Sequence, residues 1–175
     1  MLSTRLVRLI EKHSEALSKA LAIEIRASER TSDFRNIPQY ELQLAAIELY
    51  RHLEEWLLEK TDCDIARRFK SIAARRAVQG IRPEQYVWAL MLTRNQLWNF
   101  LRREAFADTI VALHGELELY QLLNQFFDRA VYYAVLGHDE AEDRNMHSNL
   151  RRVQELATSI GLMEERRAET NYAEE

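Results

Sequence analysis

The stretch DTIVALHGELELYQLLNQFFDRAVYYAVLG, from Asp108 to Gly137, is the longest apolar run with helical spacing in this chain. Asp108 is suited to cap the first turn, and Gly137 to end the helix in the left-handed conformation. Because apolar residues cover much of its circumference, we expect this helix to be central and to touch neighbours on several sides. These residues are Val111, Leu117, Leu119, Tyr120, Leu122, Leu123, Phe126, Phe127, Val131, Tyr132, Tyr133 and Val135.

The chain before this stretch predicts four more helices. Apolar residues recur at three- and four-residue steps over residues 2–27 and 38–59, and the polar residues 28–37 between them predict a loop. A third helix follows the capping residues at 61–64 and ends at Gly80, and Pro83 opens a fourth. Short connections favour antiparallel neighbours. The sequence therefore predicts an all-α fold, a helical bundle of about five main helices plus a long C-terminal helix.

Composition excludes several functional classes. The 24 Lys and Arg residues nearly balance the 28 Asp and Glu residues, so nothing favours binding to nucleic acid or to an anionic membrane. Cys63 is the sole cysteine, which excludes an internal disulfide, and its acidic neighbours disfavour a thiolate. No apolar run reaches the ~18 residues of a membrane span, and residues 1–12 do not resemble a secretion signal. We expect a cytoplasmic protein.

The character of the chain changes after Gly137, which divides it into a helical bundle (1–137) and a charged C-terminal helix (138–175). In this helix a narrow apolar seam has the 3.5-residue period of a coiled coil. The seam comprises Met146, Leu150, Val153, Ala157 and Ile160. Two interpretations stay open, a last helix folded back on the bundle or a dimerising signalling helix, and the narrow seam favours the second. Beyond Met163 the seam ends, and we expect the terminus to fray.

Recognisable catalytic and metal-binding patterns are missing from the sequence. The histidines lack metal-ligand spacing, and no nucleophile motif is found. Carboxylates occur in pairs, as at Glu54 and Glu55, but none of these pairs is joined to a base or metal ligand in a recognisable pattern. We therefore predict a protein that is not an enzyme and has no metal or cofactor. An alternative is a haem- or gas-binding globin-like sensor with His52 or His114 as the haem ligand, because a helical bundle with a buried histidine can hold haem.

The third helix is basic, and most of its arginines are expected on a solvated face. Arg76 differs, because at 100° per residue it falls on the apolar face. A buried guanidinium needs an acidic partner. We therefore predict a polar cluster inside the bundle and interpret it as a structural ion pair. Its members are Arg76, Arg94, Asn124 and Asp128.

A ligand pocket would distinguish a sensor from a purely structural dimerisation module. Large aromatic side chains on the fourth and fifth helices are candidates to line it. They are Trp88, Trp98, Phe126 and Tyr133.

Two segments carry a resemblance to a known family. The segment ARRAVQGIRPEQYVWALMLTRNQLWNFLRRE (74–104), followed by LYQLLNQFFDRAVYYAVLGHDEAE (119–142), resembles the RsbRD-like N-terminal sensor domains of bacteria. The shared order is an arginine-containing helix ending in glycine, a helix with tryptophan and a final Arg-Glu, and a long helix with Asn-x-Phe-Phe-Asp and paired aromatics. The resemblance covers roughly residues 9–142.

The resemblance implies a non-catalytic input module that precedes a histidine kinase, a sulphate-transporter-like or another output domain. This sequence departs from that arrangement because it stops at Glu175, so it is either part of a longer protein or a stand-alone regulator. No ligand set is implied. We expect a homodimeric sensory or regulatory domain that passes a signal through residues 138–175 to an output domain or signalling protein, with an unknown small-molecule ligand.

Overall fold

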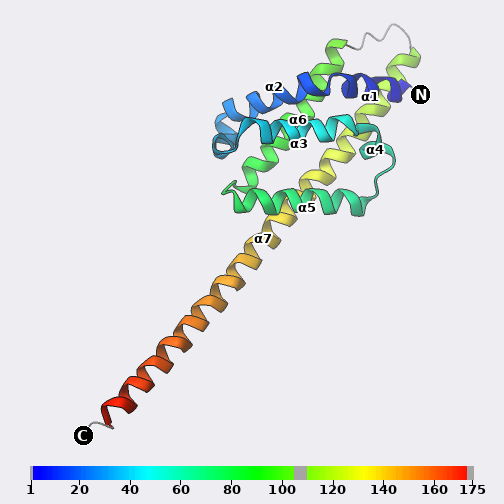
Figure 1. Ribbon diagram of the computed structural model, residues 1–175. Coiled ribbons are helices and arrows are strands. Elements are labelled where there is room, and N and C mark those ends of the chain that lie inside the picture. Colours follow the sequence, from blue (N-terminus) through cyan, green and yellow to red (C-terminus); the bar gives the residue numbers. More distant parts are fainter. Residues whose placement is uncertain (1, 105–109, 173–175) are drawn as a thin grey trace. The chain divides into compact units, whose positions relative to one another are not determined.

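The computed structural model describes the backbone of residues 2–104 and 110–172, and the side chains of 5–104 and 114–160 (Figure 1). The described secondary structure is entirely helical, which confirms the all-α prediction. The chain divides into two compact units, Met1–His138 and Asp139–Glu175, and the division lies one residue from that predicted after Gly137.

The first unit contains seven helical elements and the beginning of an eighth among its described residues. Figure 1 shows α2 beside α3, and both α2 and η1 contact α6. Side chains from these helices and from the first part of α7 form one apolar core. The elements are α1 (Leu2–Lys12), α2 (Ser14–Ala27), the 3₁₀ helix η1 (Glu29–Asn36), α3 (Gln39–Arg51), α4 (Leu53–Leu58), α5 (Asp62–Val78), α6 (Pro83–Glu104) and α7 (Ile110–Tyr172).

The helix predicted over residues 2–27 is interrupted at His13. The backbone there has φ −100° and ψ 12°. The His13 backbone nitrogen lies 3.2 Å from the Leu9 carbonyl oxygen and 3.0 Å from that of Ile10. The His13 ring Nδ1 also lies 2.9 Å from the Leu9 carbonyl oxygen, and the ring packs on Phe100. A side chain that hydrogen-bonds to its own turn competes with the helical ladder, which explains the break without proline or glycine.

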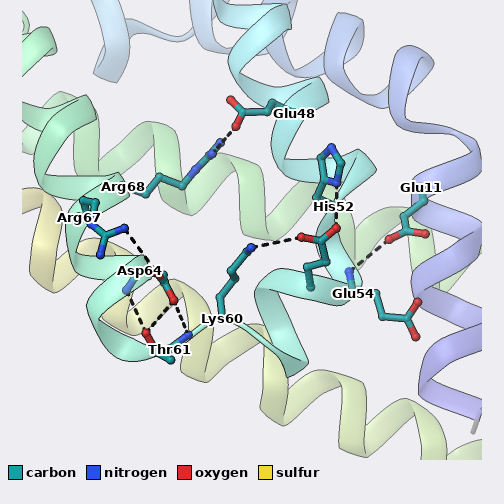
Figure 2. A network of polar contacts seen from close by, with 10 residues as sticks. Glu11, Glu48, His52, Glu54, Lys60, Thr61, Asp64, Arg67 and Arg68 are labelled. Carbon is teal, nitrogen blue, oxygen red and sulfur yellow. Dashed lines mark hydrogen bonds and ion pairs between the residues drawn. The ribbon is translucent and has the colours of Figure 1, made fainter.

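The helix predicted over residues 38–59 is interrupted at His52. This break exposes the first backbone N–H groups of α4, and Glu11 of α1 supplies an acceptor, because its Oε1 lies 3.2 Å from the Glu54 nitrogen (Figure 2). His52 in turn pairs with Glu55 at 3.2 Å. The break therefore lets a carboxylate from another helix cap α4.

The loop predicted over residues 28–37 is wrong in part, because most of it is the 3₁₀ helix η1. Ser28 caps η1 by accepting from the Arg30 N–H, and the buried Thr31 hydroxyl donates to the Ile25 carbonyl. Phe34 and Ile37 are buried in the core. The sequence pattern predicts a polar loop because the buried residues of this segment, Thr31, Phe34 and Ile37, are few and are separated by polar residues.

The boundaries of α5 and α6 follow the predicted signals. Thr61 and Asp64 form a capping box at the start of α5. Gly80 has φ +77°, the left-handed conformation that favours glycine, and Pro83 begins α6. These predictions are confirmed.

The expectation that the helix ends at Gly137 is wrong, and Asp108, its predicted cap, lies outside the described residues. The helix α7 continues from Ile110 to Tyr172. A Cβ on Gly137 would lie 2.5 Å from the Lys70 Cα and 2.9 Å from the Lys70 carbonyl oxygen. Glycine is therefore required here because α5 and α7 approach closely, and not because a helix ends.

The described part of α7 in the first unit buries one face rather than most of its circumference. Large side chains such as Phe126 and Phe127 are followed on this face by Ala130 and Ala134, which are almost fully buried. Several residues predicted to be buried are instead exposed. These are Leu117, Tyr120, Tyr132 and Val135.

A buried polar chain joins three helices of the core. The Tyr50 hydroxyl donates to Gln96 Oε1 at 2.8 Å, and Gln96 Nε2 donates to the Leu17 carbonyl oxygen at 2.9 Å. Burial raises the pKa of the Tyr50 hydroxyl, which therefore remains protonated and able to donate.

We expect Tyr50→Phe to lower the free energy of unfolding by about 1–3 kcal/mol, because Gln96 Oε1 loses its buried donor. Tyr40→Phe removes the same atom from a residue that is 67% exposed and is expected to change stability by less than ~0.5 kcal/mol. Urea unfolding of both variants measures the difference, and equal effects would contradict the importance of the buried chain.

We expect Gly137→Ala to destabilise the protein by about 1–2 kcal/mol, although alanine is the better helix former, because the new methyl group meets the Lys70 backbone. Val135→Ala, on the exposed side of the same turns, is the control. Thermal unfolding compares the two, and a more stable Gly137→Ala variant would show that α5 and α7 do not approach closely.

Candidate functional site

An apolar cavity of about 80 Å³ lies between α2, α3, α5 and α6 and is closed on one side by η1. Most of its lining is aliphatic or aromatic, and the exceptions are two arginines and one threonine. The lining residues are Leu21, Ile25, Phe34, Leu42, Ala45, Ala46, Leu49, Arg68, Phe69, Ile72, Arg76, Tyr86, Ala89, Leu90 and Thr93. A concave apolar space with a few polar groups is the usual form of a small-molecule site.

Arg76 is the most deeply buried charge of the cavity, with only 5% of its side chain exposed. This confirms the burial predicted from its place on the helix. Its Nη1 donates to Glu41 Oε1 at 2.8 Å and to Gln79 Oε1 at 2.6 Å. Its Nε is buried without a hydrogen-bond partner among the described residues. Such an unpaired donor costs about 1–3 kcal/mol, so the site has an unused hydrogen-bonding capacity.

Arg68 repeats this arrangement two turns earlier on α5. Its side chain is 12% exposed, and its Nη1 lies 2.7 Å from Glu48 Oε1 (Figure 2). Its guanidinium lies 4.8 Å from the centre of the Trp56 ring. The Arg68 Nε also has no partner among the described residues. Arg68 was expected on a solvated face, and this expectation is wrong. It shares the helical face of Ile72 and Arg76, a spacing that could have revealed it.

Ion pairs join α3 to α5 along the rim of the cavity. Glu41 in the first turn of α3 accepts a hydrogen bond from Arg76, and its Oε1 lies 2.9 Å from Arg75 Nη2. Hydrogen bonds from Gln79 and Arg76, together with the charges of Arg76 and Arg75, hold the pKa of Glu41 below its ordinary value. Glu41 is therefore ionised at neutral pH and balances the buried guanidinium.

Tyr86 also lines the cavity and is buried. Burial raises the pKa of its hydroxyl, although the charges of Arg76 and Arg68 act in the opposite direction. The phenol therefore stays protonated, and its O–H is a potential donor beside the arginines.

The predicted polar cluster does not form as a unit. Arg76 has its acidic partner, but that partner is Glu41 of α3 and not Asp128. Arg94 and Asp128 form a separate pair at 3.6 Å, in which Asp128 is 75% exposed. Asn124 is half-buried one turn before Asp128. The helical wheel located the buried charge but carries no information about a partner on a distant helix.

The four aromatic residues predicted to line a pocket do not line this cavity, although Trp98 lines a separate cavity of about 40 Å³. The Trp98 ring lies tilted against Tyr120, and Trp88 lies under the guanidinium of Arg30. Phe126 is buried against Phe69 and Trp56 in the core. Tyr133 donates a hydrogen bond to Asp62. Size and helical spacing singled out these residues, but each one contacts a different neighbour.

The histidines proposed as alternative haem ligands lie on the surface. The His52 side chain is 54% exposed and pairs with Glu55, and His114 is exposed on α7. Cys63 is exposed in the first turn of α5, as expected for a residue without a structural role. The described residues contain no cluster of three or more side chains suited to a metal ion.

The second unit presents the predicted seam on its helix. The seam residues are all exposed, and four of them are large: Met146 (60%), Leu150 (56%), Val153 (62%) and Ile160 (57%). Leu156, which the seam pattern omits, is 63% exposed beside it.

Comparisons with known proteins give no further identification. No family model matches the chain, and neither the curated proteins nor the solved structures include a match. Within residues 2–104 and 110–172, no helix is both long enough and apolar enough to cross a membrane.

We expect Glu41→Gln to lower the free energy of unfolding at pH 7 by about 2 kcal/mol, because it leaves the buried Arg76 without a charged partner. The folded-state pKa of Glu41 is lowered, so its stabilisation is present above its ordinary pKa of 4.5 and is lost as pH falls through the folded-state value. The stability difference between the two proteins should therefore shrink below about pH 4.5.

Glu29→Gln is the matched control, because Glu29 also accepts from an arginine, Arg35, at 2.6 Å but is 87% exposed. Its effect should stay below about 1 kcal/mol. Urea unfolding between pH 3 and pH 7 measures both variants. A Glu41→Gln effect that is as small as the control, or independent of pH, would contradict this role for Glu41.

Proposed function

We propose that this chain is a non-catalytic sensory or regulatory domain of a signalling protein. In this proposal the bundle receives a stimulus, and the helix of the second unit passes the change to an output domain or partner by associating with a second copy. A stimulus drives such a change only if it binds two states of the domain unequally. We also propose that the domain works in the cytoplasm.

The observation that carries the proposal is the exposed apolar seam of the second unit. Solvent-exposed apolar side chains at alternating steps of four and three are the pattern by which two helices pack in a coiled coil. Apart from Leu156, mostly charged and polar residues surround the seam, so the seam is the natural contact surface of this helix.

Two further observations support the proposal. The helix α7 is continuous from Ile110 to Tyr172, so one helix contributes both to the core of the bundle and to the seam. The resemblance of residues 74–104 and 119–142 to RsbRD-like sensor domains points to the same class of protein. The haem-sensor alternative has less support, because His52 and His114 lie on the surface.

The test is the molar mass of the chain in solution, measured by light scattering. We expect the wild-type chain to be a dimer and the double variant Leu150→Glu/Val153→Glu to be a monomer, because charges in the seam oppose its burial. The control, Ser148→Glu/Ser159→Glu, adds the same charge at exposed positions outside the seam and should remain a dimer.

A monomeric wild-type chain, or a seam variant that stays dimeric, would contradict the dimerising role of this helix. Circular dichroism of each variant separates loss of association from loss of folding. If the chain dimerises through the seam and no ligand changes that association, the purely structural dimerisation module becomes the better description.

A further inference from the structure

We infer that the arginine-lined cavity of the first unit binds a small carboxylate with a short apolar body, its carboxylate accepting from the Nε–H of Arg76. This inference deepens the proposed function and rests on it for its biological role, because it names the chemical class of the stimulus. The binding itself is a property of the cavity and can be measured separately.

The polar groups of the cavity select an acceptor. Only 5% of the Arg76 side chain is exposed, and its Nε–H has no partner among the described residues. The protonated Tyr86 hydroxyl adds a second potential donor, whereas the Thr93 hydroxyl already donates to the Ala89 carbonyl. Arginine and phenol donors suit the two oxygens of a carboxylate, and the guanidinium of Arg76 offers no acceptor to an ammonium group.

Charge at the rim favours an anion as well. Three arginines, Arg68, Arg75 and Arg76, face two glutamates, Glu41 and Glu48, so these five groups carry one net positive charge. The glutamates occupy Nη1 of both buried arginines and leave each Nε available. A bound carboxylate would therefore complete the charge balance without displacing an ion pair.

The size of the cavity limits the ligand. Its 80 Å³ is roughly half of the ~150 Å³ in which an apolar protein cavity takes up benzene, so only a short hydrocarbon body fits. Arg68 and Arg76 are eight residues apart on α5, or about 12 Å along the helix axis, so one carboxylate reaches only one of them. We assign it to Arg76, the more buried of the two, with the apolar body along Ile72 and Phe69.

The experiment follows the Nε–H resonances of the arginines in the 175-residue chain by NMR while butyrate, whose apolar body has three carbons, is added at pH 7. We expect a saturable shift of the Arg76 resonance with a Kd on the order of 1 mM. 1-Butanol lacks the carboxylate, butylammonium reverses the charge, and inorganic phosphate lacks the apolar body, so none of the three should reproduce the shift at the same concentration.

Arg76→Lys is the test variant, because it keeps the charge that faces Glu41 but removes the Nε–H. It should weaken butyrate binding about ten- to a hundredfold, as measured by calorimetry. Arg67→Lys makes the same substitution on the same helix at a side chain that is 79% exposed, and its affinity should equal that of the wild type. Ala45→Leu fills the cavity and should also abolish binding.

The absence of a saturable shift in the wild-type chain would overturn the inference, as would equal binding of 1-butanol or phosphate. If Arg76→Lys fails to fold, the comparison of the four compounds with the wild type still tests the inference. Light scattering with and without butyrate separates the two proposals. Binding that leaves the association of the chain unchanged supports the carboxylate site and contradicts only its connection to signalling.

Discussion

The burial of one guanidinium group constrains the structure of the bundle. Arg76 lies among apolar side chains of α5, where an unpaired positive charge would be strongly destabilising. Glu41 provides the compensating charge from α3, and Gln79 adds a second acceptor at the end of α5. The relative placement of α3 and α5 therefore has to bring Glu41 to Arg76, and the cavity lies between the helices that this pair joins.

The same helix connects the cavity to α7. On another side of α5, the backbone of Lys70 contacts Gly137 so closely that no other residue fits without a shift. The His138 ring, one residue further along, lies 3.0 Å from the carbonyl oxygen of Ile81 in the turn after α5. A change in the position of α5 would therefore disturb these contacts with α7. Under the proposed function, they connect the cavity to the helix that carries the seam.

Local sequence patterns predicted the elements that depend on local chemistry. The capping box at Thr61, the left-handed Gly80 and the burial of Arg76 all follow from residues within one or two turns. The partner of Arg76 could not be predicted, because Glu41 is 35 residues away and helical periodicity carries no information on distant contacts. The prediction that Gly137 ends a helix fails for a related reason. A glycine that ends a helix and one that permits a close crossing look alike in a single sequence.

The interaction between Glu41 and Arg76 can be isolated by a double-mutant cycle of Glu41→Gln and Arg76→Met, measured by urea unfolding at low and high salt. We predict a coupling free energy of about 2 kcal/mol that changes little with salt, because the Arg76 side chain is only 5% exposed. A coupling below ~0.5 kcal/mol, or one that disappears in high salt, would show that the pair is an ordinary surface contact. The buried arginine would then not be the constraint on which the bundle and its cavity depend.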